Sequence, residues 1–311
     1  MDKLRIIFMG TPDFAVPSLD ILIEKGFDIV AVITAPDRPK GRGQKLAASP
    51  VKEAALRHGI TVLQPANLKN PDFIQALKGF KANLQVVVAF RMLPEVVWNM
   101  PPIGTFNLHA SLLPQYRGAA PIHWAIINGE KETGVTTFFL KHEIDTGKII
   151  FQEKEPIHED DTVGKLYGRL MEKGGKLVLK TVQAIEQGDY PQIKQDESGE
   201  LKKAPKIFRE TCEVDWSKST NEVYNFIRGL SPYPAAWTIV NKLNLKLYKV
   251  KPLLKESNLV PGQFDTDNKS YLHFRTQNGL IEIQELQLQG KKRMAIDEFF
   301  RGNRLAMQKD F

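Results

Sequence analysis

The first 150 residues alternate short apolar runs with segments of helical spacing, and this alternation is the feature that most constrains the fold. Runs such as KLRIIFMG, FDIVAVIT and NLQVVVAF are rich in β-branched residues, whereas SPVKEAALRHG and PDFIQALKGF carry apolar residues at helical spacing. Strands that alternate with helices predict a parallel sheet. VVVAF lacks polar alternation, which is typical of a strand covered on both faces. We therefore predict an α/β fold whose N-terminal part is a doubly wound, Rossmann-like, mostly parallel sheet.

The second half of the chain has a different pattern. Residues 161–189 have the spacing of a long amphipathic helix, and the next stretch, DYPQIKQDESGELKKAPKI, is polar and weakly periodic. Beyond it, short runs such as LKLYKVKPLL and LIEIQELQLQ predict strands separated by turns, which suits a small β-barrel of the OB-like type. The predicted boundaries are an α/β domain at 1–189, a linker at 190–208 and a C-terminal β-barrel domain at 209–311.

Composition excludes several classes of protein. The single cysteine, Cys212, cannot form an internal disulfide, and neither His123 nor His142 has metal-ligand spacing to a partner, so we expect no metal. No apolar stretch approaches the roughly 18 residues that cross a bilayer, so we expect a cytoplasmic protein without membrane contact. MGTPDF resembles a turn after a first strand but is not G-x-G-x-x-G, which disfavours nicotinamide binding.

Two polar residues close a predicted strand in the stretch NLHASLLPQYRGAAPIHWAIING. If TFNLHA is a strand, Asn107 and His109 lie two apart and point to the same side of the sheet. The ends of such strands form the ligand crevice of open α/β sheets. A polar pair that is satisfied at a strand end is the simpler interpretation of N-x-H alone.

A second predicted loop strengthens the catalytic interpretation. HEIDTGKII follows the strand GVTTFFL and places Asp145 near a glycine. An Asn that donates to a developing oxyanion, a His that polarises or protonates, and an Asp that orients the His suit acyl transfer through a tetrahedral intermediate. Ser111 lacks a recognisable base, so the set favours direct transfer between two bound substrates.

Four segments resemble the methionyl-tRNA formyltransferase family, within the folate-dependent formyltransferase superfamily. They are FMGTPDFAVPSL, TAPDRPKGRGQKLAASPVK, NLHASLLPQYRGAAPIHWAIINGE and EIDTGKII. KAPKI, VDW and IRGLSPYPAAW resemble the C-terminal module of that family, so the resemblance covers nearly the whole chain. One departure is FRMLP, which places Arg91 where glycine is common in the family.

The resemblance implies roles for particular residues. The catalytic Asn, His and Asp of the family map onto Asn107, His109 and Asp145. The loop that contacts the folate donor, 10-formyltetrahydrofolate, maps onto Ser111, Leu112, Leu113 and Pro114. The insertion that meets the tRNA acceptor stem maps onto a basic segment containing Arg38, Lys40, Arg42 and Lys45, with Arg42 at the position of the key arginine of the family.

Charge agrees with a polyanionic partner without requiring one. The net charge is +7 and the pI is near 9.2. DRPKGRGQK has four basic residues and no acid between Arg38 and Lys45, although most charge runs are solvated surface. From Arg209 onward the sequence contains 16 Lys and Arg residues and 12 Asp and Glu residues. Contacts from these side chains to phosphates would make binding sensitive to salt.

The predicted function is formyl transfer from 10-formyltetrahydrofolate to the α-amino group of methionyl initiator tRNA, which supplies formylmethionyl-tRNA for translation initiation. We expect a monomer. The enzymatic alternative is a folate-dependent formyltransferase for an amino-sugar nucleotide, which would have little use for the basic segment. A non-catalytic RNA-binding protein on the same scaffold is a third hypothesis, and the intact Asn107, His109 and Asp145 argue against it.

Overall fold

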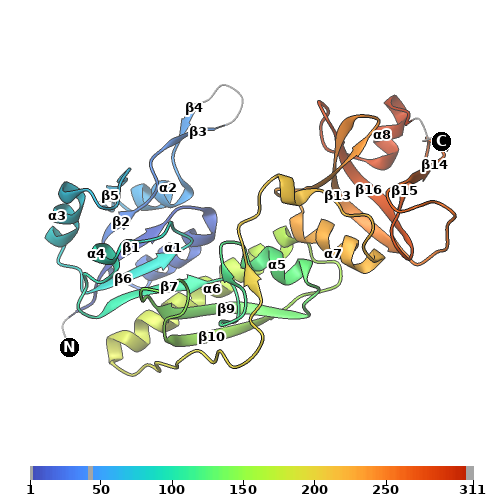
Figure 1. The fold of residues 1–311 in the computed structure, drawn as a ribbon. Helices are drawn as coiled ribbons and strands as arrows, with labels where there is room; N and C mark the ends of the chain where they lie inside the picture. The colour runs from blue at the N-terminus through green and yellow to red at the C-terminus, as the bar shows by residue number, and fades with distance from the viewer. Residues whose placement is uncertain (1–2, 41–44, 306–311) are drawn as a thin grey trace. The chain divides into compact units, whose positions relative to one another are not determined.

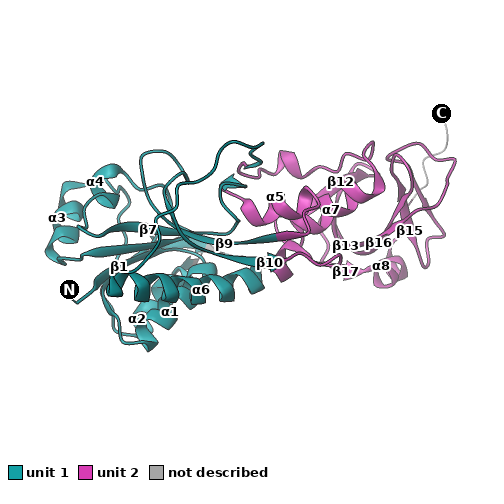
Figure 2. Cartoon of the chain, turned by 90° about the horizontal axis from the view of Figure 1, so that it is seen from below, with its two compact units in different colours: residues 1–118, 133–155, 167–203 teal, residues 119–132, 156–166, 204–311 magenta. Residues whose placement is uncertain are grey.

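The computed structural model describes residues 3–40 and 45–305. The chain divides into two compact units that each draw on three segments of the sequence, as Figure 2 shows by colour. Unit 1 contains residues 1–118, 133–155 and 167–203, and unit 2 contains residues 119–132, 156–166 and 204–311. The predicted division at 189 and 208 follows the linear sequence instead, and it stays a prediction.

A seven-stranded sheet forms the centre of unit 1, in the order β10-β9-β7-β6-β1-β2-β5. The prediction of a mostly parallel sheet is confirmed, because five neighbouring strands run parallel and β9 pairs antiparallel with β7. The strands are β1 (Arg5–Gly10), β2 (Asp28–Ile33), β5 (Val62–Leu63), β6 (Leu84–Val88), β7 (Gly104–His109), β9 (Glu132–Phe139) and β10 (Ile149–Pro156). β10 begins inside the segment HEIDTGKII, for which the sequence predicted only a loop.

Helices cover both faces of this sheet (Figures 1 and 2). On one face α3 (Pro71–Gly79) and α4 (Glu95–Trp98) bury a core that includes Ile7, Met9 and Val87. The other face carries α1 (Val16–Glu24), α2 (Pro50–Arg57) and the long α6 (Val163–Gln187). The 3-10 turn η1 (Asp13–Ala15) precedes α1.

The helix starts follow capping chemistry that the sequence carries. The Ser49 side chain accepts the Lys52 N–H at the start of α2, and Asn70 accepts the Asp72 and Phe73 N–H groups at the start of α3. A proline follows directly in both helices, at the position where its missing N–H costs nothing. These caps fix the entry of each helix into the layers of unit 1.

Unit 2 is built on an antiparallel sheet of order β12-β13-β16-β15-β14, with β17 added beside β16. Its strands are β12 (Ala236–Val240), β13 (Leu243–Leu253), β14 (Phe264–Thr266), β15 (Leu272–Arg275), β16 (Leu280–Leu288) and β17 (Met294–Ala295). The pairing of β13 with β16 shifts register between Leu247 and Val250, which marks a bulge. The core includes Trp216 stacked on Phe274, with ring centroids 4.5 Å apart.

Three helices complete unit 2: α5 (Pro121–Ile127), α7 (Thr220–Leu230) and α8 (Ile296–Gly302), with the 3-10 turn η2 (Glu210–Cys212). Ser219 and Glu222 form a reciprocal capping box at the start of α7. An added Cβ at Gly229 of α7 would lie 2.7 Å from Ile127 of α5, so the glycine permits close packing of the two helices. The short strand β11 (Lys203–Ala204) spans the sequence position where unit 1 ends.

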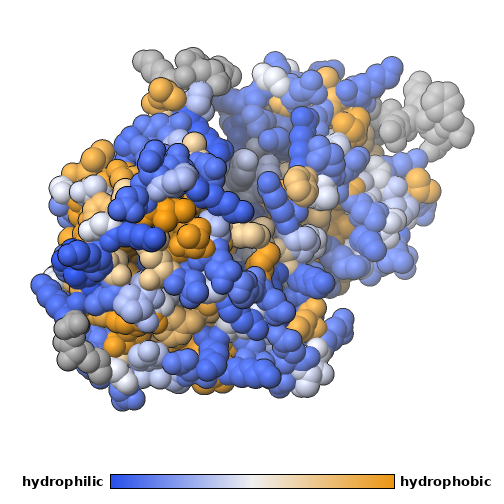
Figure 3. Space-filling model, turned by 60° about the vertical axis from the view of Figure 1, so that its left-hand side comes forward, coloured by the Kyte–Doolittle hydropathy of each residue, from blue (hydrophilic) through white to orange (hydrophobic). Residues whose placement is uncertain are grey.

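The described residues include no membrane-spanning helix and no single large hydrophobic area on the face drawn in Figure 3. None of their helices has the length and apolar character needed to cross a membrane. On the face drawn in Figure 3, hydrophobic residues form separate patches among hydrophilic ones.

Candidate active site

The end of β7 carries the two polar residues that the sequence singled out. β7 lies between β6 and β9, with Asn107 opposite Val87 on one side and Phe138 on the other. His109 is buried, with 6% of its surface exposed, whereas Asn107 is half-buried. Within the described chain, no hydrogen bond engages the Asn107 side chain. Its amide is therefore available to a bound molecule.

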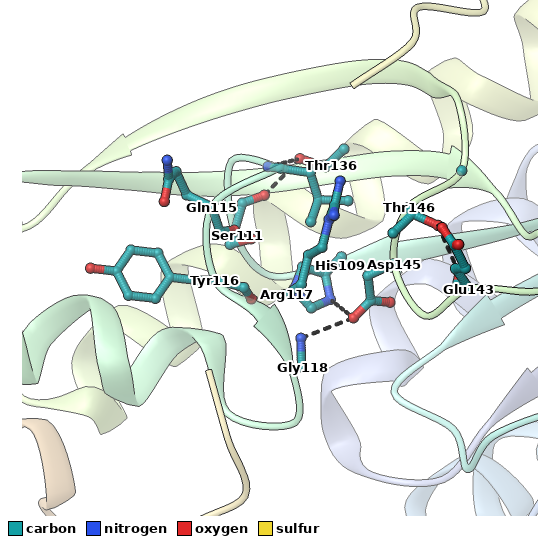
Figure 4. Close-up of polar contacts among 12 residues, drawn as sticks. His109, Ser111, Gln115, Tyr116, Arg117, Gly118, Thr136, Glu143, Asp145 and Thr146 are labelled. Carbon is teal, nitrogen blue, oxygen red and sulfur yellow. Dashed lines mark hydrogen bonds and ion pairs between the residues drawn. The ribbon is translucent and has the colours of Figure 1, made fainter. Parts of the chain in front are cut away.

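The two ring nitrogens of His109 face different partners. Nε2 lies 2.9 Å from the carbonyl oxygen of Tyr116, and because a carbonyl only accepts, Nε2 carries the hydrogen. Nδ1 lies 3.9 Å from Oδ2 of Asp145, as Figure 4 shows. This separation exceeds a hydrogen bond but permits an ion pair when the ring is protonated. A protonated ring keeps the Tyr116 bond and presents an Nδ1–H on the side of Asp145.

Asp145 is held in an uncommon backbone conformation. Its φ is 56°, in the left-handed region that non-glycine residues seldom adopt. Oδ2 accepts the N–H of Gly118 at 3.0 Å, at the end of the short strand β8 (Arg117–Gly118). An aspartate tolerates this region better than most residues, and a strained backbone of this kind is often found at functional sites.

The Gln195 side chain fixes the loop that carries Asp145. Its Nε2 donates to the carbonyls of Asp145 and Gly147, each at 2.8 Å, and only 5% of the residue is exposed. Its Oε1 accepts from Nε and Nη2 of Arg117 at 3.1 and 2.6 Å. Arg117 also pairs with Glu197 at 2.7 Å and holds the pKa of that carboxyl below its usual range.

Gly147 adds a steric condition to the same loop. A Cβ built there would lie 1.6 Å from the carbonyl oxygen of Phe139, at the end of β9. Only glycine therefore permits this approach between loop and strand. Neither Gln195 nor Arg117 was assigned a role from the sequence, since Gln195 lies in the polar stretch predicted to be a linker.

The predicted folate loop is largely engaged with the protein interior. The Ser111 hydroxyl donates to the Gln115 carbonyl at 2.6 Å, which leaves it unsuited to act as a nucleophile. The Leu113 N–H and carbonyl bond to Thr136 and Gln152, and the Leu113 side chain packs with Phe138 and Ile149. Leu112 and Pro114 are half-buried. These two offer the accessible apolar surface of the loop.

The described part of the basic segment forms a short antiparallel hairpin of two strands. β3 (Arg38–Lys40) pairs with β4 (Lys45–Ala47), with Arg38 opposite Ala47 and Lys40 opposite Lys45. Arg38 is exposed, and Arg42 lies outside the described residues. Strands of three residues are too short to produce a period that sequence analysis detects.

Arg91, the departure from the family pattern, bonds to backbone carbonyls. Its guanidinium donates to the Ala66 carbonyl at 2.9 Å and to the Pro65 carbonyl. Burial lowers the pKa of Arg91, and the charge of Arg38 lowers it further. Arg91 lines a groove of about 1030 Å³ together with residues 66–69 and 92–96. Two of the basic groups on this side of unit 1 are thus close enough to repel each other.

No group of three or more His, Cys, Asp or Glu side chains suited to a metal ion occurs among residues 3–40 and 45–305. The site instead combines a hydrogen-bond donor, an imidazole and a carboxylate. This set can stabilise a developing oxyanion and accept a proton from an attacking group.

Comparison with known proteins agrees with this chemistry. Residues 3–182 match the model of the formyl transferase family, and residues 206–304 match that of the formyl transferase C-terminal domain. The chain therefore belongs to the formyl transferase family. A methionyl-tRNA formyltransferase of Bacteroides fragilis is 56% identical over 309 residues, which cover 97% of this chain and 95% of that protein.

Two solved structures share the fold at low identity. HypX from Aquifex aeolicus superposes with a TM-score of 0.67 at 19% identity, and the alignment covers 98% of this chain but only 49% of HypX. An N-formyltransferase from Helicobacter canadensis, solved with folinic acid and dTDP-3-aminofucose, gives a TM-score of 0.65 at 24% identity, with 94% and 100% coverage. These two comparisons show the fold alone.

Proposed function

We propose that this chain transfers the formyl group of 10-formyltetrahydrofolate to the α-amino group of methionyl initiator tRNA. The observation that carries the proposal is the pairing of His109 with Asp145 beside the free Asn107 amide, at the end of β7. The high sequence identity between this chain and methionyl-tRNA formyltransferases, over nearly its full length, supports methionyl initiator tRNA as the acceptor.

In the proposed reaction the neutral amine attacks the formyl carbon, and the carbonyl oxygen becomes an oxyanion. The Asn107 amide and Nδ1–H of a protonated His109 donate to that oxyanion, while Nε2–H stays bonded to Tyr116. Asp145 accepts the proton released by the attacking nitrogen. The oxyanion then re-forms the carbonyl as the bond to N10 of the folate breaks, and N10 takes up the proton that Asp145 had accepted. Preorganised donors of this kind stabilise the transition state without reorganising during the reaction.

We propose that Ser111, Leu112, Leu113 and Pro114 form a wall of the folate site. Leu112 and Pro114 would supply apolar contact, because the polar groups of Ser111 and Leu113 already have partners in the protein. Arg38, Lys40, Arg42 and Lys45 would contact tRNA phosphates. The closeness of the Arg38 and Arg91 charges supports an anionic ligand on this side of unit 1.

The remaining inferences concern organisation. We infer a catalytic domain at 1–189, a linker at 190–208 and a tRNA-binding domain at 209–311 whose curled antiparallel sheet is an OB-like barrel. We also infer a cytoplasmic monomer, since charged initiator tRNA is used in the cytoplasm of bacteria. Size-exclusion chromatography with light scattering at several protein concentrations tests the monomer.

A formyl-transfer assay with three acceptors tests the function. Purified protein and 10-formyltetrahydrofolate are mixed with methionyl initiator tRNA, methionyl elongator tRNA or an amino-sugar nucleotide at one salt concentration. We expect rapid transfer to the initiator and little to the others. Transfer to the sugar nucleotide, or to no acceptor, would overturn the assignment.

A further inference from the structure

One face of strand β9 supports the loop of residues 111–114 at three successive positions. Gly134, Thr136 and Phe138 are each two residues apart along the strand, so they lie on the same side of the sheet. Each of the three contacts a different part of the loop. None of them takes part in the proposed reaction, and the sequence assigned no role to any of them.

The Thr136 hydroxyl is the centre of this contact. The side chain is fully buried, and its Oγ1 donates to the Ser111 carbonyl at 2.6 Å (Figure 4). The same oxygen accepts the Leu113 N–H at 3.2 Å and an N–H of the Gln152 side chain at 2.9 Å. A hydroxyl offers one donor and two acceptor positions, so all three are used. One buried side chain therefore fixes the loop backbone on both sides of Leu112.

Gln152, on β10, completes the network from the neighbouring strand. Its Nε2 donates to the Leu113 carbonyl and to the Thr136 hydroxyl, each at 2.9 Å. Both backbone polar groups of Leu113 are thus held by side chains that lie outside the loop. Because a buried carbonyl or N–H that loses its partner costs free energy, these bonds oppose any rotation of the loop backbone.

Packing fixes the leucine side chains of the loop on the same face of β9. A Cβ built on Gly134 would lie 2.5 Å from Cδ2 of Leu112, so Leu112 lies directly over the glycine. Leu113 packs on Phe138, at the third position of this face. Leu112 remains half-buried, so part of its surface stays open to a ligand. The strand thus determines both the backbone path of the loop and the placement of its accessible leucine.

We propose that Thr136 and Gln152 are positioning residues for the formyl donor, because they hold the loop of residues 111–114 in the shape that receives the folate. This role rests on the proposed function, which places the folate against the loop. Neither side chain donates to the folate, since every hydrogen of the Thr136 hydroxyl and the Gln152 amide is bonded within the protein. Their effect on the donor passes through Leu112 and Pro114.

Binding of 5-formyltetrahydrofolate, an isomer of the donor, tests this role without any acceptor. Isothermal titration calorimetry on the full chain measures the Kd. Thr136→Val keeps the shape of the side chain but leaves the Ser111 carbonyl and the Leu113 N–H unpaired, so the Kd should rise roughly tenfold. Thr136→Ser retains the hydroxyl and should bind within about twofold of the wild type. Gln152 is exposed, so water can replace its donors, and Gln152→Leu should raise the Kd by only about threefold.

Thr137→Val is the matched control. Thr137 is as fully buried as Thr136 but lies on the other face of β9, where its hydroxyl is 2.9 Å from the hydroxyl of Thr181 on α6. Its replacement should lower the thermal midpoint as Thr136→Val does, but leave the Kd for 5-formyltetrahydrofolate unchanged. Steady-state kinetics should show the same contrast, because Thr136→Val should raise the KM for 10-formyltetrahydrofolate and leave the KM for initiator tRNA unchanged.

Three results would overturn the positioning role. They are wild-type affinity in both Thr136→Val and Gln152→Leu, an equal loss in Thr137→Val, and a loss in Thr136→Ser as large as that in Thr136→Val. If Thr136→Val does not fold, Gln152→Leu carries the test, because an exposed side chain can be replaced without opening a cavity.

The outcome separates the positioning role from the proposed function. Formylation of initiator tRNA with an unchanged donor KM in Thr136→Val and Gln152→Leu would refute the positioning role and leave the function standing. A protein that formylates no tRNA, yet loses affinity for 5-formyltetrahydrofolate in Thr136→Val and not in Thr137→Val, would refute the function and leave the positioning role standing.

Discussion

The three proposed catalytic residues differ in how firmly the fold holds them. The Tyr116 carbonyl fixes the ring of His109, and the Gly118 N–H and the bonds from Gln195 fix Asp145. The Asn107 side chain has no such partner within the described chain. His109 and Asp145 are therefore preorganised, and Asn107 completes the set only when a substrate oxygen reaches its amide.

Replacement of Asn107 tests this view at the residue itself. Asn107→Ala removes one donor to the oxyanion, and such a loss typically lowers kcat by about 10²–10³-fold. The thermal midpoint should change little, since no bond within the described chain is lost. Steady-state formylation kinetics measure the effect, with the exposed Asn99→Ala as control. Near-wild-type kcat at saturating substrates would show that Asn107 has no role in the chemistry.

Gln195 gives a second residue-scale prediction. Gln195→Ala frees two loop carbonyls and leaves Arg117 with Glu197 alone, so Asp145 should lose its fixed position. We expect kcat to fall about tenfold or more, in line with the sensitivity of catalysis to small misplacements, with little change in the KM for tRNA. Gln195→Glu keeps an acceptor for Arg117 but loses the donor, so it should not restore kcat. The exposed Gln192→Ala should behave as the wild type, and an equal loss there would contradict the positioning role.

At the scale of elements, the site depends on how loops close against strand ends. The loop with Asp145 passes over the end of β9 at a distance that excludes a side chain at Gly147. In unit 2, α5 and α7 pack through Gly229, and Nδ1 of His123 donates to the Gly229 carbonyl at 2.8 Å. In each contact a single glycine determines where a whole segment can lie: Gly147 for the loop with Asp145, and Gly229 for the packing of α5 on α7.

Gly147→Ala should disrupt the loop and the activity together. The added methyl group would collide with the Phe139 carbonyl, and such overpacking typically costs about 1–3 kcal/mol of stability. Gly199→Ala is the matched control, because a Cβ there meets no atom within 4 Å. Thermal denaturation and kcat for both variants test the contact. If the two variants match each other, the close approach at Gly147 has no consequence.

The α5–α7 contact predicts a dependence of stability on pH. Burial lowers the pKa of His123 below its ordinary value of about 6.5, and the bond to Gly229 offsets only part of this. Below about pH 6.5, His123 binds a proton in the unfolded chain but not in the folded chain. The free energy of unfolding therefore falls as the pH drops from about 6.5 through the lower pKa of the folded state.

His123→Asn removes the titration and retains a side-chain donor. We expect its thermal midpoint to approach that of the wild type as pH falls from about 7.5 to 5.5. His273, whose pKa is also lowered by burial, is present in both proteins, so its contribution cancels. Parallel midpoints across this pH range would refute the assignment to His123.

At the scale of the whole molecule, long segments with a clear apolar pattern could be predicted from the sequence. Short strands, charged strands and the assignment of separate segments to one unit could not. β1, β2 and β6 are nearly continuous apolar runs and α6 has a strong helical period, and the existence of all four is confirmed. β10 was missed because the charged FQEKEP hides its alternation, and the three-residue strands of the hairpin carry no usable period. Nothing local indicates that residues 119–132 join unit 2.

The site was predictable to a similar degree. Asn107 and His109 follow from two-residue spacing on one strand, and the structure places Nδ1 of His109 3.9 Å from Oδ2 of Asp145. Their catalytic roles stay predictions. Gln195 could not be found, because a glutamine in a polar stretch looks like any solvated residue. Its importance arises from bonds to residues 50 and 78 positions away in the sequence.

Salt dependence tests the partner of the molecule as a whole. If Lys and Arg side chains contact tRNA phosphates, log kcat/KM for initiator tRNA should fall linearly with log salt, while kcat at saturation changes little. Arg38→Gln should reduce the magnitude of this slope by about 1, the contribution of one phosphate contact. Lys78→Gln on α3 should leave the slope unchanged. A slope near zero would argue against a phosphate-based interface.

The single cysteine has a practical consequence for labelling. Cys212 is 1% exposed, its thiol donates to the Phe208 carbonyl at 3.1 Å, and burial raises the pKa of the thiol. Maleimide reagents attack the thiolate, which is scarce for such a group near neutral pH. A cysteine introduced at an exposed position such as Leu254 should therefore take a dye or spin label selectively in the otherwise native chain. Distance measurements on this enzyme can begin without first removing its own thiol.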